Sequence, residues 1–224
     1  MSRAEMIKKV YQNRTDLSTF LVHLTKDQGD GVTAKQTFET ILGTTPHKII
    51  AKSPVGLFCK HASENNFPDQ SQKDCFNNFL KVICLTESPL DQIKHFIGKD
   101  FERDNSTIKY SEYGFVFTRE FIQQKGGNPC FYVCTQDTRN MQSAFLSLFD
   151  LLKDKWIYFS LDTIPNNSAF NILRFVNIFG KDSTDNPIDY FWEREWRIPL
   201  QELQFNDQDL ALALCPESEI EAGT

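Results

Sequence analysis

An apolar segment that runs directly into a helix-start signal restricts the fold of this chain more than any other feature. Phe79–Glu87 is mostly apolar and predicts a strand. Ser88 then fits the N-cap of a helix, and Pro89 fits its first position. Gly98 is the expected end of that helix. A strand and helix joined without a linker predict a fold in which both kinds of element share one core.

Similar patterns occur along the rest of the sequence, in no regular order. We expect further helices over residues 2–13, 33–43, 118–126 and 137–155, and further strands over 18–26, 47–54, 113–117, 128–135, 189–199 and 210–216. Residues 170–180 are ambiguous between helix and strand, and the polar residues 59–75 predict an exposed irregular segment. These elements favour a single α+β domain over residues 18–224, preceded by an N-terminal helix within residues 1–17. Its sheet is expected to be mixed, mainly antiparallel and flanked by helices.

Charge and cysteine usage restrict the class of protein. The net charge of −6 opposes sequence-independent binding of nucleic acid, which remains only as a possible substrate. No apolar run is long enough for a membrane helix, and the polar N-terminus is unlike a signal peptide. Six cysteines without a C-x-x-C pair predict reduced thiols in a cytoplasm. No histidine pair has metal-site spacing, so we expect no metal.

Two acids and a base alternate in the sequence YFWEREWRIP. On a strand, Glu193, Glu195 and Arg197 would share one side, opposite Trp192 and Trp196. Because the large rings favour burial, we expect the charged side to face solvent, a cleft or a partner. One interpretation is a solvated sheet face with ion pairs to neighbouring strands. The other is a pair of rigid carboxylates lining a site, able to stabilise positive charge or take a proton.

Three other residues are candidates for a site. His23 lies in an otherwise apolar expected strand, where it is either a hydrogen-bonded core residue or a ligand-binding group. Glu87 and Ser88 lie where a strand ends and a helix begins. Such residues either cap the helix or line a cleft in which free N–H groups bind a polar ligand.

Several motifs resemble one family. The segments VICLTESPLDQIKHFI, YSEYGFVFTREFIQQKGGNPCFYV, FWEREWRIP and LCPESEI resemble abortive-infection phage-resistance proteins of the AbiGi type, from about Phe20 to Ile220. Relatives continue after the P-x-x-x-I element into another apolar strand, whereas this sequence stops at EAGT. The resemblance implies bacterial phage defence, in a family labelled as the antitoxin-like member of a two-gene system.

A second resemblance suggests chemistry. An early strand His followed by Thr, an aromatic middle strand and a late E-x-E strand are similar to NAD-dependent ADP-ribosyltransferases. That resemblance implies that Glu195 binds the nicotinamide ribose and stabilises the oxocarbenium-like state, and that Glu193 orients or deprotonates the acceptor. The cofactor-binding residues that it implies are His23, Thr25, Tyr113, Phe117 and Arg197.

Three hypotheses therefore remain. The chain is an NAD-dependent ADP-ribosyltransferase-like effector, or a non-catalytic antitoxin or interaction module that neutralises a toxin or effector protein from the same operon. Alternatively, the row of charged residues formed by Glu193, Glu195 and Arg197 only stabilises the sheet, and the site lies around Glu87.

Overall fold

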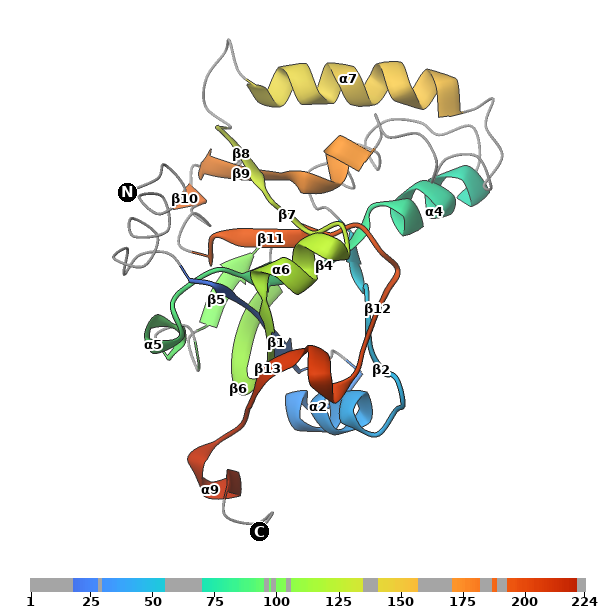
Figure 1. Ribbon diagram of the computed structural model, residues 1–224. Helices are drawn as coiled ribbons and strands as arrows, with labels where there is room; N and C mark the ends of the chain where they lie inside the picture. Colours follow the sequence, from blue (N-terminus) through green and yellow to red (C-terminus); the bar gives the residue numbers. More distant parts are fainter. Residues whose placement is uncertain are drawn as a thin grey trace, which may run out of the picture. The chain divides into compact units, whose positions relative to one another are not determined.

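The computed structural model describes residues 18–27, 30–54, 70–94, 97, 100–103, 106–134, 141–156, 171–181, 187–188 and 193–220 (Figure 1). The helix expected over residues 2–13 lies outside these ranges. The chain forms two compact units. Unit 1 comprises Met1–Lys48, Leu85–Gln124 and Gln204–Thr224, and unit 2 comprises Ile49–Cys84 and Lys125–Leu203. Helices accompany mainly antiparallel strands, so the predicted α+β fold class is confirmed.

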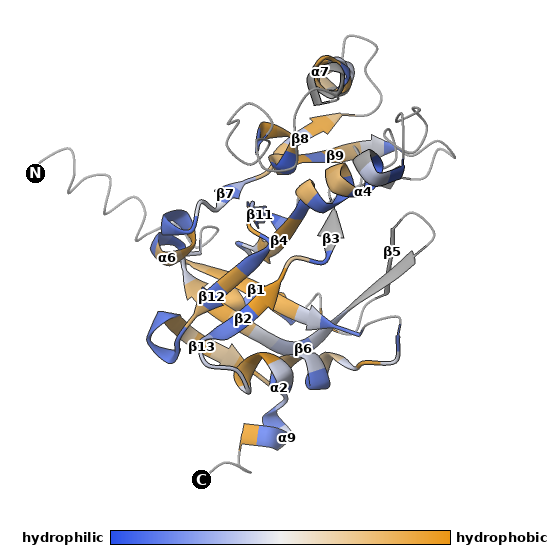
Figure 2. Ribbon diagram, turned by 90° about the vertical axis from the view of Figure 1, so that its right-hand side faces the viewer, coloured by the Kyte–Doolittle hydropathy of each residue, from blue (hydrophilic) through white to orange (hydrophobic). Residues whose placement is uncertain are grey.

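Unit 1 is built on a long central strand. This strand, β6, has β1 on one side and β13 on the other, both antiparallel to it. β5 also pairs with β6, and β1 pairs with the end of β4. The bounds are β1 (Phe20–Lys26), β4 (Lys81–Thr86), β5 (Asp100–Arg103), β6 (Ser106–Thr118) and β13 (Leu210–Leu214). Hydrophobic residues of β1 and β6, including Val22 and Val116, pack with Ile93 in a buried cluster. Figure 2 colours these strands by hydropathy.

Gly114 is required where β6 lies against β1. A Cβ atom at this position would lie 2.8 Å from the carbonyl oxygen of His23 and 3.0 Å from a methyl carbon of Leu24. Real Cβ atoms do not approach a backbone oxygen so closely. Glycine therefore allows the two strands to pair at this point.

The helix of unit 1 near its N-terminus follows the sequence expectation. α2 (Ala34–Leu42) begins after Thr33, whose hydroxyl accepts from the backbone N–H of Gln36, and it ends at Gly43. The Gln36 side chain accepts from the backbone N–H of Thr33, which completes a capping box. Phe38 of α2 stacks on Phe115 with ring centroids 4.8 Å apart.

Within the described residues, the remaining helices of unit 1 are short. They are α5 (Leu90–Ile93), α6 (Arg119–Gln124) and α9 (Glu217–Ile220). Thr118 accepts from the backbone N–H of Phe121, as expected of a cap. The prediction for Ser88 was wrong, because Pro89 is the N-cap of α5 and no side chain caps this helix. The Ser88 backbone N–H instead donates to the hydroxyl of Thr86.

Among the described residues of unit 2, β4 and β11 are neighbours in one group of strands, and β8, β9 and β10 form another. β8 and β9 are parallel, β10 pairs antiparallel with β9, β11 pairs with β7, and β3 pairs with β4. The long helix between β8 and β9 supplies the crossover that a parallel pair requires. The bounds are β3 (Ser53–Pro54), β7 (Asn128–Pro129), β8 (Phe131–Cys134), β9 (Val176–Lys181), β10 (Pro187–Ile188) and β11 (Glu195–Ile198).

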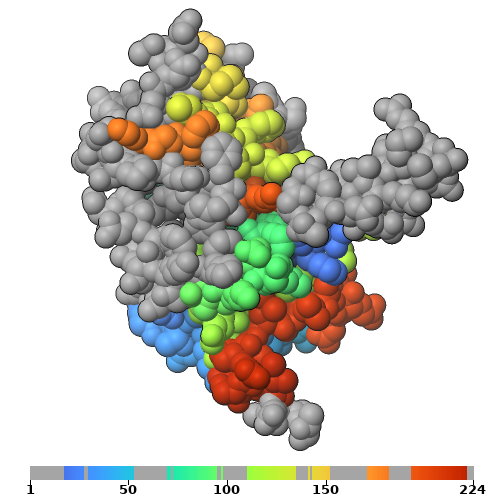
Figure 3. All heavy atoms as spheres, turned by 90° about the vertical axis from the view of Figure 1, so that its left-hand side faces the viewer, coloured from blue at the N-terminus to red at the C-terminus, as the bar shows by residue number. Residues whose placement is uncertain are grey.

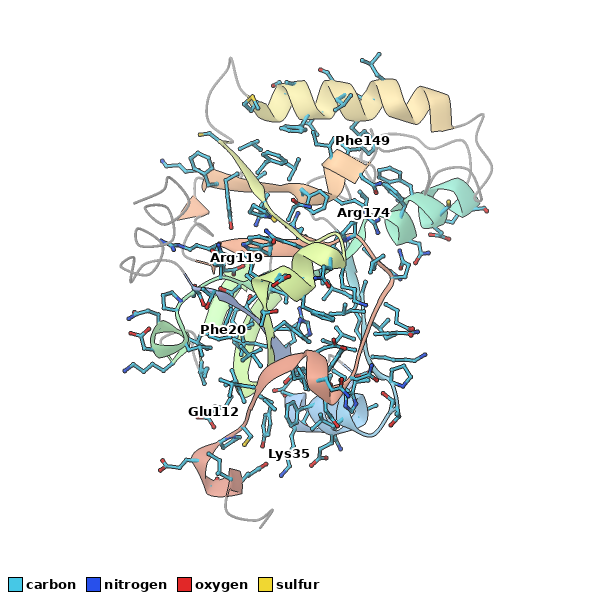
Figure 4. The ribbon with its side chains drawn as sticks, viewed as in Figure 1. Phe20, Lys35, Glu112, Arg119, Phe149 and Arg174 are labelled. Carbon is cyan, nitrogen blue, oxygen red and sulfur yellow. The ribbon has the colours of Figure 1, made fainter. Side chains whose placement is uncertain are left out.

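The core of unit 2 lies under its helices. Phe76 and Phe79 come from α4, and Phe145 and Phe149 come from α7. Phe76 meets Phe149, which is labelled in Figure 4, edge-on with ring centroids 4.9 Å apart. The bounds are α4 (Gln70–Phe79), α7 (Met141–Trp156) and the 3₁₀ helix η2 (Ile172–Phe175).

Some elements differ from the sequence expectation. The segment expected to be irregular over residues 59–75 is helical from Gln70, and the ambiguous segment 170–180 divides into η2 and β9. The strand expected over residues 189–199 is shorter, since β11 begins only at Glu195. A strand that the sequence did not predict, β12 (Glu202–Phe205), pairs with β2 (His47–Ile50) and is followed by the 3₁₀ helix η4 (Asp207–Asp209). No helix in the described ranges is long and apolar enough to cross a membrane.

Candidate functional site

Glu195 and Arg197 form a buried ion pair in unit 2. Nε of Arg197 donates to Oε1 of Glu195 over 2.9 Å, and Nη2 of Arg197 donates to Oε2 over 3.0 Å. The exposed fractions of the two side chains are 4% for Glu195 and 3% for Arg197. The predicted shared side of the strand is confirmed for these two residues. We expected this side to face solvent, a cleft or a partner, and this was wrong for Glu195 and Arg197, because every residue of β11 is buried and groups of the same unit cover the pair.

The ion pair is enclosed by further hydrogen bonds. Nδ2 of Asn177 donates to Oε2 of Glu195 over 2.6 Å, and Nη1 of Arg197 donates to the carbonyl oxygens of Val176 and Arg174. Both carboxylate oxygens therefore accept from buried donors. Burial lowers the pKa of Arg197, but the adjacent carboxylate of Glu195 outweighs it, so the pKa is raised overall. Arg197 therefore stays charged across the ordinary pH range.

Two neighbours of this pair, Tyr132 and Cys130, have raised pKa values. The hydroxyl of Tyr132 accepts from the backbone N–H of Glu195 over 2.9 Å, and burial raises its pKa. Burial also raises the pKa of the Cys130 thiol, so this cysteine is protonated and unreactive. Within the part of the chain that the structure describes, Cys75, Cys84, Cys134 and Cys215 form no disulfide.

Glu193 does not extend the charged row. It lies in a 3₁₀ segment before β11, and Arg194 between the two acids has a φ of 43°. This left-handed conformation interrupts the alternation that would place Glu193 beside Glu195. The expectation of three charged groups on one strand was therefore wrong for its first member. Glu193 is half-buried outside the strand.

Arg174 is a second buried cation in unit 2, and it also donates hydrogen bonds to backbone carbonyl oxygens. Nη1 of Arg174 donates to the carbonyl oxygen of Pro199 over 2.7 Å, and Nη2 donates to that of Lys81 over 2.8 Å (Figure 4). Its guanidinium carbon lies 4.7 Å from the ring centroid of Phe79. Three separate segments of unit 2 are joined through this one side chain.

The residues expected to bind NAD are divided between the units. His23, Thr25, Tyr113 and Phe117 belong to unit 1, whereas Arg197 belongs to unit 2 with Glu195. Neither unit by itself gathers all these side chains around a common space. His23 is half-buried on β1, opposite Phe115 of β6.

In unit 1, three of these side chains stabilise the fold. The Thr25 hydroxyl donates to the carbonyl oxygen of Tyr113 over 3.0 Å, where β1 and β6 shift register. The Tyr113 hydroxyl donates to Oε1 of Glu219 over 2.8 Å. Phe117 is fully buried, with its ring centroid 5.5 Å from that of Phe121 and 5.0 Å from that of Phe205. Phe117 therefore occupies a core position rather than a ligand-facing one.

The Glu87 region of unit 1 contains a second acid–base pair. Nη2 of Arg119 donates to Oε1 of Glu87 and to the carbonyl oxygen of Ser18 (Figure 4). The exposed fractions are 22% for the Arg119 side chain and 13% for that of Glu87. Ser88 is buried and accepts from the Thr86 hydroxyl over 3.0 Å. Here too the candidate side chains bind each other and the backbone.

A surface pocket in unit 1 was not predicted from the sequence. Its volume is about 230 Å³, and it lies between α6 and the start of β13. Its lining is mostly polar and includes two acids; the lining residues are Thr118, Glu120, Phe121, Gln124, Gln208, Asp209, Leu210 and Ala211. A signal was present in the sequence, because a polar run carrying two aspartates directly precedes LALAL.

Metal ligands are not clustered in the described ranges, where no group of three or more His, Cys, Asp or Glu side chains could hold an ion. Comparison with protein-family models, with curated proteins and with solved structures found no match to this chain.

Proposed function

We propose that this chain is a non-catalytic protein-binding module of a bacterial anti-phage system, and that it neutralises a partner toxin. The resemblance of its motifs to AbiGi-type proteins supports the defence context. The buried hydrogen bonds of Glu195 support a role without catalysis. The acidic net charge of −6 suits the masking of a basic partner.

The observation that carries this proposal is that both oxygens of the Glu195 carboxylate accept hydrogen bonds from buried side chains of the same unit. A carboxylate that stabilises an oxocarbenium-like state must direct at least one oxygen at the ligand. Both oxygens of Glu195 already accept from Arg197, and Oε2 also accepts from Asn177. Releasing one oxygen would leave part of a buried guanidinium without its counter-charge, which is costly. A structural role fits this arrangement better than a catalytic one.

The competing proposal is an NAD-dependent ADP-ribosyltransferase, and a direct assay separates the two. The purified chain is incubated with nicotinamide-labelled NAD, and nicotinamide release is measured beside an isothermal titration with NAD. We expect no release above the buffer control and no saturable heat. Nicotinamide release that is abolished by Glu195→Gln would overturn the non-catalytic proposal. The matched control is Glu202→Gln, which makes the same chemical change on a half-buried glutamate of unit 2.

The binding role has its own test. The chain is co-expressed with the product of the neighbouring gene, and growth and co-elution are measured. We expect the chain to restore growth and to elute with that product as one complex. Toxicity that persists while both proteins are soluble and separate would contradict the proposal.

A further inference from the structure

β13 is an edge strand with an exposed apolar surface. It terminates the order of strands in its sheet, and among the described residues it pairs only with β6. Figure 3 shows the C-terminal residues, in red, at the surface of the molecule. The exposed fraction of the Leu212 side chain is 50%, and Ala213 is also exposed. We refer to the side of Leu210–Leu214 that faces away from β6 as the β13 edge.

The β13 edge has few of the features that normally prevent an edge strand from pairing. Natural edge strands are protected by charged side chains, by proline or by bulges that twist them away. β13 has the sequence LALAL, with no charged residue and no proline (Figure 2). Its one irregularity is a register shift between Leu210 and Leu212. Ala211 and Leu214 pack against the core cluster of β1 and β6, which leaves Leu212 and Ala213 outside.

The ends of the β13 edge are acidic. Asp207 and Asp209 precede the strand, and Glu217 follows it. Asp209 also lines the 230 Å³ pocket together with Glu120. The side chains of Glu120 and Glu217 are exposed. An apolar strand is therefore bounded by carboxylates at both ends, with a polar pocket at its first residues.

These charges argue against a second copy of the chain as the occupant. An antiparallel pair of β13 strands centred on Leu212 would bring η4, with Asp207 and Asp209, toward α9 of the other copy, with Glu217, at both ends. A parallel pair in register would place each acid beside its own equivalent. Like charges that are brought close together repel each other. Positive charge on the occupant would instead be attracted at both ends.

We propose that the β13 edge binds an extended segment of the partner protein, with an apolar centre flanked by Lys or Arg, which adds a strand to the sheet. This inference rests on the proposed binding function and names the surface that performs it. Main-chain hydrogen bonds supply affinity in this mode, and alternate side chains supply specificity.

A designed peptide tests the chemistry without the natural partner. The probe is a fluorescent nonapeptide with a Val-Thr-Val-Thr-Val centre and two lysines at each end, and binding is measured by fluorescence anisotropy at low salt. We expect saturable binding to the full chain. A peptide with glutamates in place of the lysines, and one with proline at the central valine, should each bind at least tenfold more weakly. Equal binding of all three peptides would overturn the proposal.

Variants of the protein locate the binding surface. Leu212→Lys and Ala213→Lys should each weaken binding of the basic peptide at least tenfold, with unchanged circular dichroism. The matched control is Ile50→Lys, because the exposed fraction of Ile50 is 51% and this residue lies in unit 2. Peptide binding that is equally strong in wild type and in both β13 variants would overturn the assignment to this edge.

Two further measurements separate the surface from the function. If the complex with the product of the neighbouring gene forms equally well with Leu212→Lys, the binding function stands and the β13 edge is excluded. Analytical ultracentrifugation of the chain alone should show a monomer. A dimer that Leu212→Lys dissociates would overturn the proposal, since the occupant would then be a second copy.

Discussion

β11 and β13 reverse the usual relation between charge and burial. β11 contains a glutamate and an arginine in four residues, and all four are buried. β13 contains only leucine and alanine in five residues, and two of them are exposed. Composition alone would predict that the charged residues of β11 are exposed and that all residues of β13 are buried. Both predictions would be wrong. Position in the fold, rather than residue type, decides which strand a partner can reach.

The difference also separates two uses of polar contacts. In β11 the charges are satisfied inside the protein, by each other and by Asn177, so they hold several segments together. In β13 the outward side faces away from its only described neighbour, β6. A charged row is a weak indication of a site when its partners lie within the same unit. An uncharged edge strand is the stronger indication of a binding surface.

The largest expected effect follows removal of one member of the buried ion pair. Arg197→Met leaves the Glu195 carboxylate buried without its counter-charge, and it also removes the donor to the Val176 and Arg174 carbonyl oxygens. We expect the free energy of unfolding to fall by about 3–5 kcal/mol. Urea denaturation followed by circular dichroism measures this change.

Two variants test the cause of that effect. Adding Glu195→Gln to Arg197→Met removes the unpaired charge, so the double variant should recover part of the lost stability. Arg194→Met changes a half-buried cation of the same segment and should cost less than about 1 kcal/mol. If Arg197→Met were no more harmful than Arg194→Met, the assignment of β11 as a structural strand would fail.

A second substitution tests the inner neighbour of β13. Gly114 of β6 is paired with Leu214 of β13, and a Cβ atom at this position would lie 2.8 Å from the His23 carbonyl oxygen of β1. Gly114→Ala should therefore destabilise the protein by about 1–3 kcal/mol, because the two strands must move apart. Differential scanning fluorimetry measures the shift in Tm. Gly31→Ala is the control, since a Cβ atom there meets nothing within 4 Å, although its φ of 87° adds some strain.

Local sequence signals predicted the elements whose cause is local. The helices expected over residues 33–43, 118–126 and 137–155 are found as α2, α6 and α7, and the first two have a capping threonine within a few positions of their start. The strands β1 and β13 also lie where apolar runs predicted them. The N-cap of α5 was misassigned because Thr86 binds Ser88 instead.

The environment of the charged row could not be predicted, because it depends on residues distant in sequence. The groups that bind Glu195 come from Asn177, 18 positions away, and from Tyr132, 63 positions away. The length of β6 and the existence of β12 depend on pairing with other segments in the same way. Alternation alone gives the side on which a residue lies and does not give what covers that side.

A pH effect is expected at the turn that leads into β13. Nε2 of His47 lies 2.9 Å from Oδ1 of Asp207 in η4, and this bond raises the pKa of His47 above its usual 6.5. A histidine whose folded-state pKa is raised contributes stability fully below pH 6.5, and that stability is lost as the pH rises through the higher folded-state value.

The size of this effect is small, because the Asp207 side chain is 90% exposed. We expect the unfolding free energy to fall by less than about 1 kcal/mol as the pH rises from 6.5 through the raised pKa. Asp207→Asn should flatten this dependence, as measured by urea denaturation at a series of pH values. A slope that persists unchanged in Asp207→Asn would assign the titration to another group.

The smallest effect on stability is expected at the β13 edge itself. Leu212 is half exposed, and lysine is one of the residues that natural edge strands carry, so Leu212→Lys should change the unfolding free energy by no more than about 0.5 kcal/mol. Leu203→Lys in β12 is the contrasting variant, because Leu203 is fully buried, and it should destabilise the protein severely. Urea denaturation of the two variants, beside binding of the basic peptide, measures stability and recognition separately. A Leu212→Lys protein that loses several kcal/mol would show that this leucine stabilises the core, and β13 would then resemble β11 rather than differ from it.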